Sequence, residues 1–142
     1  MIQFAIIVLS LILTVNQAFA EEAVIYAHVG QNSLMIQLVD NSSGRAFVDL
    51  LRKGDLTVEM NDYGNFEKVG HIGSSLPRND EHITTKPGDV ILYQGNQITI
   101  YYDRNSWNFT RLGRVQNANQ AKLKAILGDG NVTVRFSLKD KE

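Results

Sequence analysis

Hydrophobic and polar residues alternate with a period of two along most of the chain after position 20. This period places successive side chains on opposite faces of the backbone and is typical of β-strands. In the clearest example, Val132, Val134, Phe136 and Leu138 share one face. The alternation predicts strands at 24–29, 34–39, 56–60, 90–93, 97–102, 109–115 and 132–138.

Two segments show the spacing of amphipathic helices instead. The first has Phe47 and Leu51 on its apolar face, and the second is Ala118–Leu127. Polar residues that accept from free amides mark helix starts, and glycine marks helix ends. The expected caps are Ser42 or Ser43 and Gly54 for the first helix, and Asn117 or Asn119 and Gly128 for the second.

The segment Phe66–Lys86 interrupts the alternation, because Gly70, Gly73 and Pro77 lie within it. We interpret it as an irregular surface loop of about twenty residues. Loops of this length in compact domains are uncommon and disproportionately functional. The remaining short strands and the two helices indicate a mainly β domain, a closed or nearly closed barrel with helices at its ends. The chain contains no internal repeat and no linker.

The N-terminal segment has the features of a signal peptide. Phe4–Leu13 is apolar apart from Ser10 and is too short to span a membrane comfortably. Ala18 and Ala20 follow at the two positions that a signal peptidase reads. No Lys or Arg precedes the apolar run, so an uncleaved anchor helix is the alternative. We expect a signal peptide at 1–20, a domain at 21–142, and a periplasmic or secreted location.

The composition argues against several function classes. With 14 basic and 15 acidic residues and a net charge of −1, the chain lacks the basic excess of nucleic-acid binders. The same balance disfavours stable association with anionic membranes after signal cleavage. The absence of cysteine excludes disulfides and cysteine-ligated metals. The domain must therefore be stabilised by burial.

The order of these elements and several local strings resemble the bacterial cyclophilin-like domain family, whose members share the barrel of peptidyl-prolyl isomerases. The resemblance implies an eight-stranded barrel with two capping helices and spans essentially the whole mature chain. It implies much less about activity, because most members have no established function. The matching strings are Arg45–Leu51, Leu56–Asn65 with Lys68, Ser75-Leu76-Pro77, Gly88–Tyr93, Ile98–Tyr102, Arg111–Val115 and Gly128–Val134.

Prolyl isomerisation is the enzymatic function that this resemblance suggests. Isomerases of the cyclophilin fold place an arginine against the prolyl nitrogen and hold the ring in an aromatic cup. Their Phe-His-Arg triplet and Gln-Gly-Gly-Asp string are both absent, and Gln94-Gly95-Asn96 matches the second only superficially. The candidate cations are Arg111 and Arg114. A shared fold does not by itself carry the activity.

Aromatic and arginine residues gather between positions 102 and 114. Trp107, the single tryptophan, is either a ligand platform or a partly buried aromatic residue at a barrel edge. We expect Trp107 and Arg111 to open onto one hollow on the barrel wall, flanked by the loop at 66–86. The expected ligand-binding residues are Tyr63, Leu76, Tyr102, Trp107, Phe109, Arg111 and Arg114.

Other chemistry finds little support in the sequence. His71 and His82 lie eleven residues apart in the predicted loop, and Asp80 and Glu81 adjoin His82. A zinc site prefers closer spacing on a defined element, so we expect solvated histidines and no metal. Ser74 lacks the strand-to-helix turn that presents a nucleophile in serine hydrolases. No cofactor is expected.

The leading hypothesis is therefore an exported, non-catalytic module that binds a peptide or a small organic molecule. The alternative is a divergent peptidyl-prolyl isomerase that acts on exported proteins. A third hypothesis, from another class, is an interaction domain whose exposed strands pair with a partner protein. The sequence does not determine the ligand or the oligomeric state.

Overall fold

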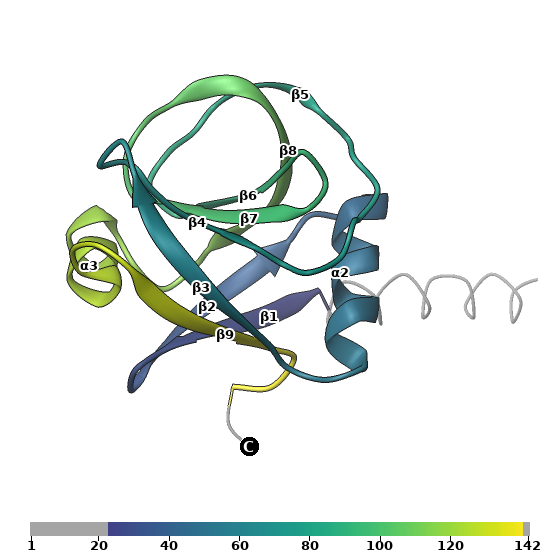
Figure 1. Ribbon diagram of the computed structural model, residues 1–142, viewed down its shortest axis with the longest axis horizontal. Coiled ribbons are helices and arrows are strands. Elements are labelled where there is room, and N and C mark those ends of the chain that lie inside the picture. Colours follow the sequence, from purple (N-terminus) through teal and green to yellow (C-terminus); the bar gives the residue numbers. More distant parts are fainter. Residues whose placement is uncertain (1–22, 141–142) are drawn as a thin grey trace, which may run out of the picture.

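The computed structural model describes residues 23–140. They form a closed eight-stranded antiparallel β-barrel with one additional strand and two helices (Figure 1). The mainly β fold predicted from the alternation and the resemblance is therefore confirmed. The predicted signal peptide at 1–20 lies outside the described residues.

Seven of the nine strands in residues 23–140 correspond to strands predicted from the sequence. The nine strands are β1 (Val24–Val29), β2 (Asn32–Leu38), β3 (Leu56–Tyr63), β4 (Glu67–His71), β5 (Glu81–Thr84), β6 (Asp89–Tyr93), β7 (Gln97–Tyr101), β8 (Ser106–Val115) and β9 (Val132–Ser137). β4 and β5 lie in the segment predicted as a loop. Around the barrel the order is β2-β1-β9-β3-β4-β7-β6-β8, and β8 pairs back with β2 to close it. β5 is the additional strand and pairs with β8.

The barrel closes at Gly113, which lies opposite Leu38 in the β2–β8 ladder. A Cβ atom on Gly113 would lie 2.6 Å from the carbonyl oxygen of Gln37 and 2.9 Å from a side-chain carbon of Ile36. Both distances are shorter than those at which Cβ atoms contact other atoms in real proteins. The lack of a side chain at position 113 therefore allows the two strands to approach closely.

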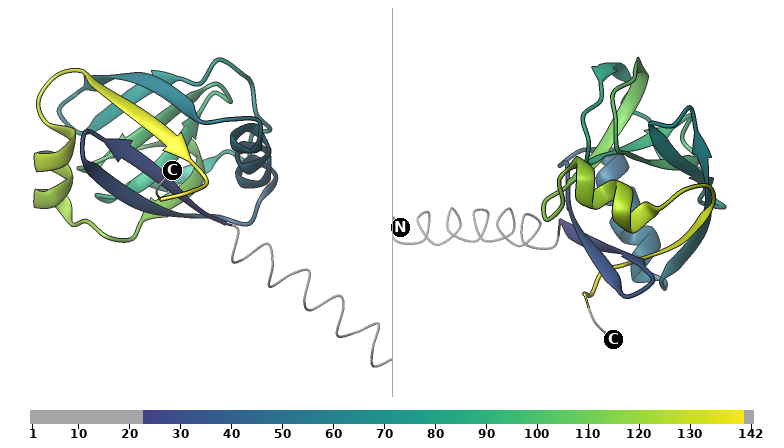
Figure 2. Two further views of the ribbon diagram at one scale, coloured as in Figure 1. Left: turned by 90° about the horizontal axis from the view of Figure 1, so that it is seen from below. Right: turned by 90° about the vertical axis from the view of Figure 1, so that its left-hand side faces the viewer.

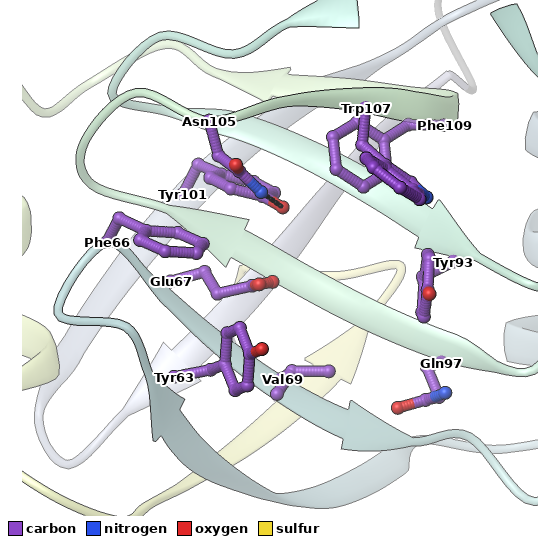
Figure 3. A pocket seen from close by; sticks show the side chains of 10 residues that line it. All are labelled: Tyr63, Phe66, Glu67, Val69, Tyr93, Gln97, Tyr101, Asn105, Trp107 and Phe109. Atoms are coloured by element: carbon purple, nitrogen blue, oxygen red, sulfur yellow. Dashed lines mark hydrogen bonds between the residues drawn. The ribbon is translucent and has the colours of Figure 1, made fainter.

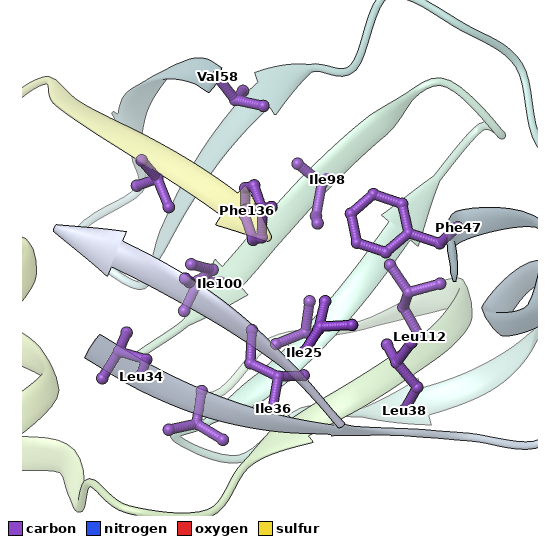
Figure 4. Close-up of a cluster of buried hydrophobic side chains, with 14 of the residues drawn as sticks. Ile25, Leu34, Ile36, Leu38, Phe47, Val58, Ile98, Ile100, Leu112 and Phe136 are labelled. Atoms are coloured by element: carbon purple, nitrogen blue, oxygen red, sulfur yellow. The ribbon is translucent and has the colours of Figure 1, made fainter. Parts of the chain in front are cut away.

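The two helices, α2 (Ser42–Arg52) and α3 (Gln120–Leu127), lie at opposite ends of the barrel (Figures 1 and 2). Phe47 from α2 and Leu123 from α3 are fully buried in the main hydrophobic core. Figure 4 shows this core, in which Phe47 meets Phe136 with ring centroids 5.9 Å apart. No helix of the described residues is long and apolar enough to cross a membrane.

Asn41 caps α2, so the predicted cap at Ser42 or Ser43 is wrong. The Asn41 side chain accepts from the Gly44 amide at 2.8 Å. The Ser43 hydroxyl instead donates to the Pro77 carbonyl, which ties the helix to the segment before β5. Asn119 caps α3 and Gly128 ends it at a φ of 68°, as predicted.

The prediction of an irregular loop at 66–86 is wrong in part, because β4 and β5 lie within it. In β4, Lys68 and Gly70 occupy the buried inner positions, so the strand lacks the apolar residues that mark a core face. β5 has four residues, of which Ile83 alone is buried. Neither strand therefore produces the alternation on which the prediction depended.

The strand predicted at 109–115 extends back to Ser106. This first part of β8 pairs with β5 in a small second sheet, whereas the later part pairs with β6 and β2. The β5–β8 ribbon arches away from β6 and β7 at the top of Figure 1. Trp107 and Phe109 lie in this ribbon, opposite Ile83 and Glu81 of β5.

Candidate functional site: an aromatic pocket on the outer wall of the barrel

A cavity of about 550 Å³ lies on the outer wall, over β4 and β7. Its size is within the range of small-molecule sites. Side chains from β3, β4, β6, β7 and β8, and from the residues just before β4 and β8, line it, and Figure 3 shows them around one space. They are Tyr63, Phe66, Glu67, Val69, Tyr93, Gln97, Tyr101, Asn105, Trp107 and Phe109.

Five of the aromatic rings form a continuous series of contacts. Phe66 stacks on Tyr101 with ring centroids 5.9 Å apart and an interplanar angle of 8°. Phe66 also meets Tyr63 edge to face, and Phe109 contacts both Tyr101 and Tyr93. Because such pairs restrain one another, the series forms a preorganised apolar wall.

Trp107 and Tyr63 are exposed, at 60% and 62%, although each carries a large apolar surface. They are the exposed large hydrophobic residues among the residues that the structure describes. Both line the cavity, from β8 and from β3. Exposed aromatic groups around a hollow are typical of binding sites.

Glu67 supplies a carboxyl group among these rings. It lies opposite Tyr63 in the β3–β4 ladder and opposite Tyr101 in the β4–β7 ladder, and it is 7% exposed. Figure 3 shows its side chain between Phe66 and Tyr63, directed toward the middle of the group. Burial raises the pKa of the Glu67 carboxyl to about 7, an effect that the Tyr101 hydroxyl opposes and the charge of Asp62 reinforces.

No ion pair involves Glu67 within residues 23–140. Burial likewise raises the pKa of the Tyr101 hydroxyl well above its usual value. Asn105 donates to that hydroxyl at 3.4 Å. The site thus combines apolar ring surfaces with an uncompensated acidic group.

Thr99 adds a polar atom to the same outer face of β7. Its neighbours on that face, Gln97 and Tyr101, both line the cavity. Thr99 itself is 2% exposed, and its Oγ1 has no hydrogen-bond partner. A buried hydroxyl without a partner is costly, so Thr99 is an unsatisfied polar residue between two lining residues, although it does not itself line the cavity.

The structure brings together three of the residues predicted to bind a ligand, since Tyr63, Trp107 and Phe109 line this pocket. It separates the others from them. Leu76 packs against the main hydrophobic core. Tyr102 belongs to that core as well.

Arg111 and Arg114 interact with the fully buried Asp89. Arg114 donates to its carboxylate at 3.0 Å, and Arg111 lies 3.6 Å from its other oxygen. Arg111 is not among the residues that line the pocket with Trp107. The indole and the guanidinium therefore do not share this hollow, contrary to the expectation from their sequence spacing.

Tyr102 also belongs to a polar cluster with Lys68 and Asp62. The ammonium group of Lys68, which is fully buried, donates to Asp62 at 3.2 Å and to the Gly130 carbonyl at 2.7 Å. The Tyr102 hydroxyl also donates to Asp62. Burial alone would raise the pKa of Asp62, but the hydrogen bonds from Tyr102 and Lys68 and the charge of Lys68 lower it overall. This cluster ties β3, β4 and the segment after α3 together.

The histidines are not assembled into a metal site. His28 interacts with the Ser33 and Ser137 hydroxyls at 2.9 and 2.7 Å, whereas His71 and His82 are exposed on β4 and β5. Within the described part of the chain, no group of three or more acidic or histidine side chains is placed to hold a metal ion.

The sequence reasoning missed several lining residues, most importantly Glu67 and Phe66. Tyr93, Gln97 and Tyr101 were detectable in part, because along β6 and β7 they alternate with residues of the main core and so lie on the opposite face of the strands. Glu67 carried no such signal, since its strand was not recognised. Because residues 66–86 were interpreted as a loop, Glu67 was not recognised as part of a strand.

The fold and the pocket define a closed β-barrel with an aromatic hollow on its outer wall. The Cyclophilin-like family model matches residues 27–137, so the chain belongs to the cyclophilin-like family. This confirms the resemblance. No curated protein matches the chain.

Several solved structures are similar in fold, among them the following two. The structure of McbB in complex with tryptophan has a TM-score of 0.58 at 16% identity, and the match covers 83% of this chain but 45% of McbB. The solution structure of the hypothetical protein AF2241 from Archaeoglobus fulgidus has a TM-score of 0.57 at 13% identity, covering 82% of this chain and 95% of that one. At these identities the likeness shows the fold alone.

Proposed function

We propose that this protein is an exported cyclophilin-like binding module and that its aromatic pocket binds a small organic molecule with a flat ring. The observation that carries the proposal is the joint placement of the two exposed aromatic residues, Trp107 and Tyr63, on one cavity. Exposed apolar surface of this kind is costly in a free protein and is removed from water when a ligand binds.

The geometry of the pocket supports a small molecule rather than a long peptide. A volume of about 550 Å³ suits a ligand of drug size. The ring series from Tyr63 to Tyr93 offers both faces and edges to a flat group. Each well-formed aromatic contact contributes about 0.5–1.5 kcal/mol beyond the burial of apolar area.

Export is the second part of the proposal and rests on the signal-peptide pattern at 1–20. Expression of the full chain in a bacterial host with an envelope, followed by fractionation and N-terminal sequencing, tests it. The proposal predicts a mature protein that begins at Glu21 in the periplasm or medium. Full-length protein in the cytoplasm would contradict it.

Peptidyl-prolyl isomerisation is the weaker candidate, because the pocket contains no arginine among its lining residues. Arg111 and Arg114, the candidate cations, interact with Asp89 instead. A protease-coupled assay with proline peptides tests this directly. The binding-module proposal predicts no acceleration over the uncatalysed rate, whereas clear catalysis would replace it with the isomerase.

Calorimetric titration with small ring compounds tests the binding proposal itself. Trp107→Ala and Tyr63→Ala should each weaken binding about tenfold, since each removes a ring from the site. Tyr26→Ala is the matched control, because Tyr26 lies on β1 and does not line the pocket. Equal affinity in all four proteins would exclude this pocket as the binding site.

A further inference from the structure

Among residues 23–140, no cation pairs with the acidic group in the aromatic pocket, Glu67. We propose that the pocket selects small organic ammonium compounds, with the Glu67 carboxylate as counter-ion and the surrounding rings as a cage. This inference rests on the proposed function and adds the charge class of its ligand.

The first argument is that the Tyr101 hydroxyl interacts with Glu67 but no cation of the described residues does. A carboxylate that is 7% exposed normally requires a cation or several hydrogen-bond donors. No ion pair among residues 23–140 includes Glu67. The pocket lining contains no lysine, arginine or histidine. A bound ammonium group would supply the charge that the protein does not.

The second argument is the arrangement of the rings. Aromatic faces attract cations, most strongly where water is excluded, and aromatic cages recognise alkylated ammonium groups for this reason. Phe66 and Tyr63 flank Glu67 in Figure 3, and Tyr101 lies opposite it across the ladder. An ammonium ion beside the carboxylate would therefore lie against ring surfaces as well.

The negative charge around the pocket disfavours anionic ligands. Asp62 acts on Glu67 as a like charge, and the two residues opposite it in the ladders, Tyr63 on β3 and Tyr101 on β7, carry no positive charge. An anionic ring compound would meet Glu67 without a compensating group. A neutral ring compound would bind the rings but leave the carboxylate without a cation.

We assign the ligand as a free amine rather than as a lysine side chain of a peptide. The pocket volume suits a complete small molecule, and the two exposed rings at its rim favour a ligand that carries an aromatic group of its own. A capped lysine residue presents the same ammonium group without a ring. Capped lysine therefore serves as the comparison compound that distinguishes a free amine from a lysine side chain of a peptide.

Three compounds of similar shape test the inference: phenethylamine, phenethyl alcohol and hydrocinnamate, which are cationic, neutral and anionic. Calorimetry at about pH 8, where Glu67 is ionised, should give phenethylamine about tenfold higher affinity than the alcohol. Hydrocinnamate should bind more weakly than both, and capped lysine more weakly than phenethylamine. Tighter binding of capped lysine would contradict the free-amine assignment.

Glu67→Gln should reduce the affinity for phenethylamine to that of the alcohol while the affinity for the alcohol stays the same. Glu59→Gln is the matched control, because Glu59 is an exposed carboxylate on β3 outside the pocket. A circular dichroism spectrum and a cooperative thermal transition verify that each variant is folded.

The outcomes separate the two proposals. Equal affinity for the amine and the alcohol, lost in Trp107→Ala, would overturn the ammonium inference and leave the binding function intact. Unchanged amine affinity in Glu67→Gln would also overturn the inference. Failure of the three aromatic compounds to bind at millimolar concentration would overturn both.

Discussion

Glu67 and Tyr101 lie directly opposite each other on the outer face of the β4–β7 ladder. Both titratable groups are shifted by burial in the direction of their neutral forms, and each acts on the other. The pair places an acidic group and a phenol among the aromatic rings that line the pocket. This relationship is the basis of the first prediction.

Ionisation of Glu67 should destabilise the folded protein. Its pKa is about 7 in the fold against 4.5 for the free side chain, so the folded state holds the proton more tightly. The free energy of unfolding should fall as the pH rises from about 4.5 to about 7, by no more than about 3 kcal/mol. Glu67→Gln should remove this decline.

Thermal unfolding of both proteins at several pH values measures the effect. At about pH 8 the variant should be more stable by about 1–3 kcal/mol, and at about pH 4 the two should agree within about 1 kcal/mol. A variant less stable than the parent at the higher pH would show that the carboxylate is stabilised in the fold.

The placement of Arg111 gives a prediction about ligand binding. Because its guanidinium lies by Asp89 and outside the pocket, Arg111→Gln should change the affinity for ring compounds by less than about twofold. Trp107→Ala should lower it about tenfold. Calorimetry on both variants compares them, and equal losses would indicate that the ligand reaches both side chains.

The ion pair between the fully buried Lys68 and the partly exposed Asp62 should be important for stability. Lys68→Met removes the cationic partner of Asp62 and the donor to the Gly130 carbonyl, so the free energy of unfolding should fall by about 3 kcal/mol. Urea denaturation measures it. Arg52→Met is the control, because its pair with Asp49 is exposed and should contribute less than about 1 kcal/mol. Similar losses in both variants would contradict the special role of the Lys68–Asp62 pair.

Closure of the barrel at Gly113 gives a further stability prediction. An added Cβ would lie 2.6 Å from the Gln37 carbonyl oxygen, so Gly113→Ala should force β2 and β8 apart. Overpacking of this kind typically costs about 1–3 kcal/mol. Denaturant unfolding together with amide exchange in β2 measures it. A fully stable variant with unchanged exchange would show that the closure tolerates a side chain.

Much of the barrel was predictable because its strands have one buried face. Residues 132–137 alternate cleanly, since Val134 and Phe136 point into the core. β4 was not predictable for the opposite reason, because the inner position of Lys68 is polar and is balanced by Asp62 from another strand. Such compensation depends on tertiary contact and leaves no local pattern.

The candidate site was predictable to a smaller extent. Trp107 and Tyr63 stand out by residue type, but their convergence on one cavity depends on the pairing of β3 with β4 and on the arch of β8. Arg111 lies four residues from Trp107 on the same strand, yet Arg111 lies opposite Ile91 of β6 and interacts with Asp89, whereas Trp107 lies opposite Ile83 of β5. Proximity in sequence was therefore a poor guide to the site.

The most direct test of the account is a titration of the isotope-labelled protein with phenethylamine, followed by two-dimensional amide and indole NMR. The account predicts that the single indole resonance, from Trp107, shifts together with the backbone amides of β4 and β7 around Glu67 and Tyr101. Resonances near Asp89 should remain in place. Shifts confined to another face of the barrel, with the indole resonance unmoved, would contradict the claim that the aromatic pocket is the binding site.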